Sequence, residues 1–185
     1  MILVSLAISS CADSGEQPSA SSILPPLESG PGDPPQNWDN PIEGTKIASV
    51  DESKQLLPFS VEEPHGLGTP TSIYVTPEEF PKPGREIAFV FDAPEYGRVV
   101  ILEMQTDETI EGWHESVTNI VAGNDSPTRS GSAASVDVRD GLEALLTTSE
   151  DGVRNTLFWI ERDVQFIVDG PALTADQVTA IANAL

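Results

Sequence analysis

One short acidic stretch holds side chains that together could bind a divalent cation. In DETIEGWHE a histidine and three carboxylates fall at helical spacing, and residues three and four positions apart share a helix face. They are Asp107, Glu111, His114 and Glu115. One imidazole with carboxylate oxygens suits several divalent metals. Thr118 stands where a zinc-protease helix needs its second histidine. We therefore favour the alternative, a solvated acidic helix face, and expect no cofactor.

Other sources of catalytic chemistry are sparse. The sequence contains neither a G-x-S-x-G nor an S-x-x-K motif. The glycine-rich stretch HGLGTP at 65–70 ends in Thr-Pro and opens no helix, which indicates a turn and not a phosphate-binding loop. Phe158 and Trp159 are candidates for lining a ligand cleft, although both are typical of a buried strand. We expect no catalytic residues.

The only cysteine, Cys11, follows an uncharged apolar stretch. The residues ISSC that end at Cys11 resemble the lipobox of bacterial lipoproteins, in which an aliphatic residue and two small ones precede a cysteine. That resemblance implies thioether lipidation of Cys11 and removal of residues 1–10. No Lys or Arg precedes Cys11, whereas a signal peptide begins with basic residues, so we expect the signal to start upstream of Met1. The alternative is a buried N-terminal strand with a chance cysteine.

The charge of the chain excludes several kinds of partner. Its 185 residues include 9 Lys and Arg against 30 Asp and Glu, for a formal net charge of −21. Such a surface repels phosphate backbones and anionic headgroups, which argues against nucleic-acid binding and against polybasic attachment to membranes. A single cysteine permits no internal disulfide. No apolar run is long enough for a retained transmembrane helix.

The composition divides the chain into three parts. Residues 1–11 form the end of a lipoprotein signal. Residues 12–44 contain six acidic residues, seven prolines and no Lys or Arg, so they predict a disordered tether. We place Trp38 in this tether; the alternative is that it packs back on the domain. Residues 45–185 carry nearly all the folding signals and predict a single globular domain.

The domain shows strand patterns followed by a capped helix. We predict strands in segments at 71–76, 85–91, 98–105, 140–148, 154–160 and 163–170. Ser49 and Glu52 predict a capping box for a short helix that ends before Pro58. Thr174 and Gln177 predict a second capping box. We expect an α+β fold, an antiparallel sheet packed by a C-terminal helix and a short N-terminal helix.

Two segments of the domain carry a further resemblance. NTLFWIERDVQFIVDGPALTADQVTAIANAL at 155–185 and SVDESKQLLPFSVEEPHGLGTPTSIYVTP at 49–77 resemble the closing and opening parts of a domain of unknown function. That domain occurs in Gram-positive lipoproteins and anti-sigma-type regulators. The resemblance implies an architecture similar to folds that cup a lipid or peptide against a curved sheet, and it brings no catalytic signature. Residues 106–135 match no pattern of this domain.

These observations predict a lipoprotein on the extracytoplasmic face of a Gram-positive cell membrane. Its domain would be a monomeric, non-enzymatic binding or sensing module. It would attach to the membrane through the lipid on Cys11 and take a small molecule, a lipid or a protein as ligand. The alternative is a hydrolase or metal-dependent enzyme whose site residues are scattered along the sequence.

Overall fold

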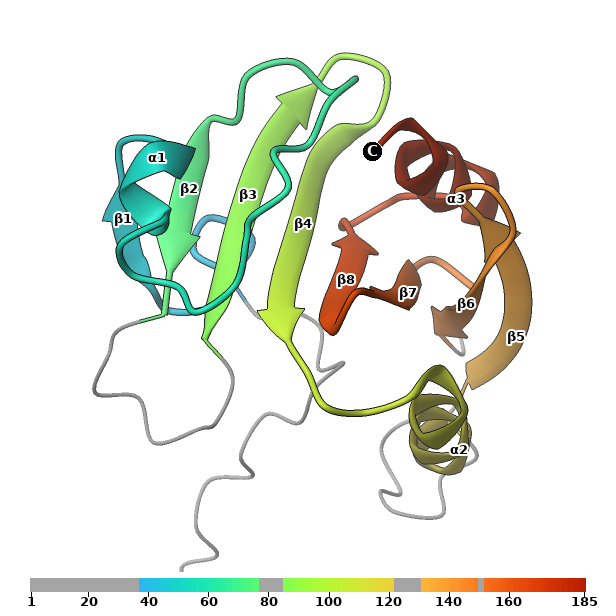
Figure 1. The fold of residues 1–185 in the computed structure, drawn as a ribbon. Coiled ribbons are helices and arrows are strands. Elements are labelled where there is room, and N and C mark those ends of the chain that lie inside the picture. Colours follow the sequence, from blue (N-terminus) through green and yellow to red (C-terminus); the bar gives the residue numbers. More distant parts are fainter. Residues whose placement is uncertain (1–36, 77–84, 122–130, 150–151) are drawn as a thin grey trace, which may run out of the picture. The chain divides into compact units, whose positions relative to one another are not determined.

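The computed structural model describes residues 37–76, 85–121, 131–149 and 152–185, which all belong to one compact unit (Figure 1). The described elements follow in chain order as β1 (Thr45–Ile47), α1 (Val50–Ser53), β2 (Ser72–Val75), β3 (Glu86–Ala93), β4 (Gly97–Gln105), α2 (Ile110–Val121), β5 (Gly131–Val138), β6 (Leu142–Ser149), β7 (Asn155–Glu161), β8 (Val164–Asp169) and α3 (Ala175–Ala184). None of the helices in these ranges is long and apolar enough to cross a membrane.

The described strands form one antiparallel sheet in the order β1-β2-β3-β4-β8-β7-β6-β5. The strands β1 to β4 form one half of the sheet and β5 to β8 the other, and within each half every strand pairs with its neighbour along the chain. The pairing of β4 with β8 joins the two halves. The expected antiparallel sheet with a C-terminal helix is confirmed, although the domain is mainly sheet and has few helices. Each of the six predicted strand segments overlaps one of the strands β2, β3, β4, β6, β7 and β8, with ends that differ by at most two residues.

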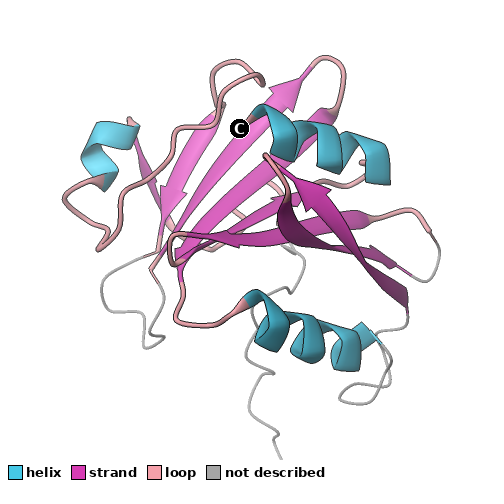
Figure 2. Cartoon of the chain, turned by 45° about the vertical axis from the view of Figure 1, so that its right-hand side comes forward, coloured by secondary structure: helices cyan, strands magenta, loops and turns pink. Residues whose placement is uncertain are grey.

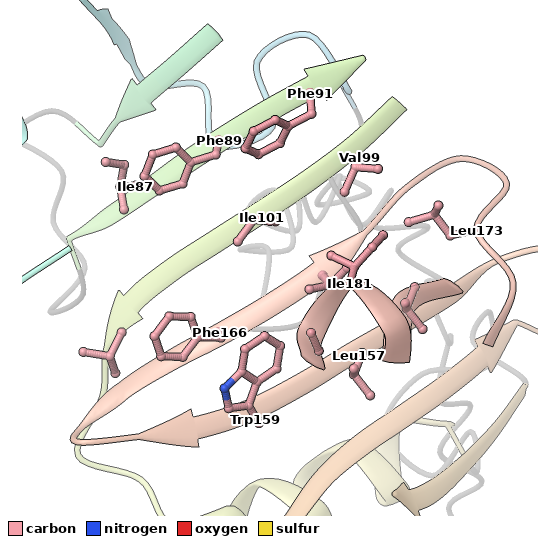
Figure 3. Packing of buried hydrophobic residues seen from close by; sticks show 14 of the residues in the cluster. Ile87, Phe89, Phe91, Val99, Ile101, Leu157, Trp159, Phe166, Leu173 and Ile181 are labelled. Carbon is pink, nitrogen blue, oxygen red and sulfur yellow. The ribbon is translucent and has the colours of Figure 1, made fainter. Parts of the chain in front are cut away.

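Helices pack against both faces of the sheet (Figure 2). We call the side that α3 covers the α3 face, and the side that α2 covers the α2 face. Alternation along the strands produces two apolar layers, because successive side chains point to opposite faces. The larger layer, on the α3 face, includes Ile87, Phe89, Phe91, Val99, Ile101, Leu157, Trp159, Phe166, Leu173 and Ile181 (Figure 3).

The α2 face has its own apolar cluster. Its centre is Trp113 of α2, whose ring lies 5.1 Å from that of Phe158 on β7. The cluster also takes in Trp38 and Ile42, which precede β1. The side chain of Arg154 lies 4.7 Å from the Trp38 ring centroid. The expectation that Trp38 stays in the tether is therefore wrong: an indole stacked under a guanidinium and packed on a buried cluster gains both contact area and a cation–π interaction.

The start of α3 follows the predicted pattern. The Thr174 hydroxyl accepts the Gln177 backbone N–H at 3.2 Å, and the Gln177 side chain accepts the Thr174 N–H at 2.9 Å. The capping box is thus confirmed in both directions. Leu173 and Val178, on either side of it, are fully buried. At α1 the outcome differs, because Glu52 accepts the N–H of Ala48 and the Ser49 side chain makes no capping hydrogen bond.

Replacing Thr174 with alanine removes the acceptor for the Gln177 N–H. We expect the free energy of unfolding to fall by about 0.5–2 kcal/mol, the usual loss for a helix N-cap. Urea unfolding measures the change. Thr174→Ser, which keeps the hydroxyl, is the matched control and should retain most of the stability; equal losses in both variants would contradict the role of the cap.

Candidate functional site

The predicted metal-binding residues do not come together as a site. They are Asp107, Glu111, His114 and Glu115, which lie just before and within the first turns of α2. Within the described residues, no group of three His, Cys, Asp or Glu side chains is placed to hold a metal ion. Cys11 and residues 12–36 of the predicted tether lie outside the described residues.

Phe158 and Trp159 do not share a cleft. As neighbours on β7 they point to opposite faces, with Phe158 in the α2-face cluster and Trp159 in the α3-face layer. Trp159 is fully buried and stacks on Phe166, with ring centroids 5.0 Å apart and planes 8° from parallel (Figure 3). Both residues are therefore part of the apolar packing of the sheet, as expected for a buried strand.

A buried carboxyl group interrupts the apolar layer of the α3 face. Glu103 on β4 lies directly across from Ile87 on β3 and from Phe166 on β8. From β2 to β5, the other residues that lie in line with Glu103 across the sheet are all apolar: Val75, Ile87, Phe166, Trp159, Ala144 and Val136. Only 1 % of Glu103 is exposed. A carboxyl group in such surroundings must be neutral or well partnered, because burial penalises its charge.

The Glu103 side chain has one hydrogen-bond partner among the described residues. Its Oε2 accepts the backbone N–H of Glu62 at 3.0 Å, and its Oε1 has no partner in the described structure. Burial raises the pKa of Glu103 to about 8, and the Glu62 carboxylate contributes to the rise. The Glu62 N–H and the Arg139 charge act in the opposite direction. At neutral pH the group is therefore mainly a protonated carboxylic acid.

Arg139 connects three elements around this acid. It lies in the β5–β6 turn, where its Nη2 donates to Glu62 Oε1 at 2.9 Å and its Nη1 lies 2.9 Å from Glu161 Oε2 on β7. Its backbone has φ +38° and donates to Asn183 of α3 at 2.7 Å. The turn is thereby fixed to the helix, and the guanidinium is held between two carboxylates.

A long connection covers the acid. Residues 54–71, which we call the crossing segment, run from α1 to β2 and pass over the α3 face, where Leu57, Phe59 and Val61 join the apolar layer (Figure 1). Glu62 of this segment supplies both the N–H for Glu103 and the carboxylate for Arg139.

The crossing segment also lines an open hollow of about 510 Å³ beside α1, β1 and β2. Val61 and Glu63, on either side of Glu62, are part of its wall. The wall mixes apolar side chains such as Ile47 with charged ones such as Lys46. A molecule in the hollow would therefore touch the same stretch of chain that holds the buried acid.

The sequence contained a signal for this site that strand prediction alone does not use. In RVVILEMQ the alternation that places Val99 and Ile101 on the buried face places Glu103 there as well. An acidic residue at an apolar position of a central strand indicates a buried carboxyl group. Its partners Glu62 and Arg139 are far away in sequence, and only the fold brings them together.

No protein-family model matches the chain, and no curated protein or solved structure was found that matches it.

Proposed function

We propose that this chain is a lipoprotein anchored through Cys11 to the extracytoplasmic face of a Gram-positive cell membrane, and that its domain is a non-enzymatic binding or sensing module. The residues ISSC and the acidic, proline-rich stretch that follows support the anchor. On this proposal the stretch works as a tether that holds the domain away from the membrane. The resemblance of residues 49–77 and 155–185 to a domain of unknown function that occurs in Gram-positive lipoproteins and anti-sigma-type regulators also supports this location.

One structural observation supports the proposal that the domain binds a ligand. The crossing segment forms a wall of the hollow through Val61 and Glu63 and covers the buried acid through Glu62. A ligand in the hollow would thus contact the stretch of chain in which the Glu62 N–H donates to the buried acid Glu103. In this α+β domain the short helix α1, with Val50 and Asp51 in the wall, would complete the site at the edge of the sheet.

The anchor is tested by Cys11→Ser in a chain with a complete signal peptide, expressed in a Gram-positive host. We expect the wild-type protein in the membrane fraction and the variant in the medium, because the thioether requires the cysteine sulfur. Ser10→Ala, which keeps a small residue before the cysteine, should remain membrane-bound. Retention of Cys11→Ser in the membrane fraction at the wild-type level would refute the anchor.

A further inference from the structure

The strand β5 forms an open edge of the sheet. Among the described strands it pairs with β6 alone, in unbroken register from Gly131 opposite Ser149 to Val138 opposite Leu142. Its side chains remain largely exposed in the whole chain, with only Val138 buried. Within the described residues, one side of this eight-residue strand therefore presents backbone N–H and C=O groups that have no strand partner.

This edge has few of the features by which natural sheets prevent strand pairing; Asp137 is the one charged residue of β5. Between Gly131 and Val138 there is no Pro, no Lys and no bulge. The opposite edge, β1, is three residues long, carries Lys46 and is followed at once by α1. A short, charged edge is protected against pairing, whereas a long edge of small side chains accepts another strand. The two edges differ in the way expected if β5 binds a partner.

The charges beside β5 indicate which side chains such a partner carries. Asp137 on β5 lies directly opposite Glu143 on β6, and like charges in this position repel. Neither has an ion pair within the described residues, and Glu143 accepts only the hydroxyl of Ser135, at 2.9 Å. The helix α2, with exposed Glu111 and Glu115, packs against β5 on the same face of the sheet. A cation next to Asp137 would relieve the repulsion.

We propose that the outer edge of β5 binds an extended, lysine- or arginine-containing segment of a partner protein, which adds to the sheet as a further antiparallel strand. Backbone hydrogen bonds along β5 hold the segment, and a basic side chain beside Asp137 selects it. A second copy of this chain is a poor occupant, since each copy brings a net charge of −21. The inference rests on the proposed function only in treating the domain as a binding module.

The probe for this site is a synthetic peptide of alternating valine and lysine residues, about as long as β5, added to the full chain in detergent. We expect saturable binding, with the largest NMR shifts at the amides of residues 131–138. The same peptide with alternate backbone nitrogens methylated keeps its charge and loses its edge hydrogen bonds, so it should bind at least about tenfold more weakly. Equal binding of the two peptides would show that charge alone attracts them and would overturn the proposal.

Two matched variants test the selection by charge. Asp137→Lys should weaken binding of the valine–lysine peptide several-fold and favour a valine–glutamate peptide. Glu95→Lys, with the same charge change in the β3–β4 turn, should leave binding unchanged. Equal effects of the two variants, shifts centred away from β5, or a dimer of the chain closed through β5 would each overturn the proposal. Membrane attachment through Cys11 is measured separately, so failure of peptide binding leaves the anchor test intact.

Discussion

Replacing Glu103 with glutamine is expected to make the domain more stable at pH 8 and above, by up to about 5 kcal/mol. The folded state raises the pKa of this carboxyl group from 4.5 to about 8, so between these values the folded chain holds a proton that the unfolded chain releases. Stability is therefore highest below about pH 4.5, falls as the pH rises to about 8, and stays low above it. Glutamine fills the same space, keeps an acceptor for the Glu62 N–H and does not ionise.

Urea unfolding of both proteins at about pH 5, 6.5 and 8.5 measures this difference. The two should be nearly equal at the lowest pH and diverge as the pH rises. The charged groups nearest Glu103, namely Glu62 and Arg139, are present in both proteins, so their contributions largely cancel. Glu95→Gln, which removes an exposed acid, is the control and should keep the wild-type pH dependence. An unchanged decline with pH in Glu103→Gln would contradict the assignment.

Replacing Arg154 with methionine is expected to cost about 3–5 kcal/mol at neutral pH, the usual result of leaving a buried charge without its partner. Asp169 is 1 % exposed, and its two carboxylate oxygens accept from Nε and Nη2 of Arg154. The N–H of Gly170 adds a hydrogen bond at 2.7 Å. Methionine retains much of the packing volume but supplies neither the charge nor the donors.

The loss should become smaller as the pH falls. Burial raises the pKa of Asp169 even though Arg154 counteracts it, so loss of Arg154 raises that pKa further. Protonated Asp169 needs no cation, and at acid pH the variant approaches the wild-type stability. The double variant Arg154→Met/Asp169→Asn removes the charge that lacks a partner and should recover most of the loss at neutral pH. If the free energy of unfolding of Arg154→Met were within about 1 kcal/mol of the wild-type value, the Arg154–Asp169 ion pair would contribute little to stability.

The strands that could be predicted from the sequence are those whose alternation is local and strong. In 85–91 Ile87, Phe89 and Phe91 share one face. In 163–170 Val164, Phe166 and Val168 do so as well. The helix α3 was equally clear because Thr174 and Gln177 mark its start. Each of these signals lies within a few residues of the element it predicts.

The elements that the prediction missed lack such signals. The strand β5 begins with glycine, serine and alanine residues, and no apolar alternation separates it from a loop. It is a strand because β6 supplies its hydrogen bonds. Trp38 was misplaced for a related reason: its neighbours are polar and proline-rich, and its partner Arg154 is distant in sequence. The position of Glu103 on a buried face was predictable, whereas its partners depended on the arrangement of the whole sheet.

The pairing of β4 with β8 has a consequence for how the chain folds. Within β1 to β4, and again within β5 to β8, each strand pairs with its neighbour along the chain, so every step closes a limited loop at modest entropic cost. The β4–β8 pairing is different, because Gln105 meets Val164 across all of α2, β5, β6 and β7. If β5 to β8 are already paired, the entropic cost of pairing β4 with β8 is much smaller. The loop that must then close consists only of the residues between β4 and β5. We therefore expect the non-local β4–β8 pairing, which places Glu103 opposite Phe166, to be the slow step of folding.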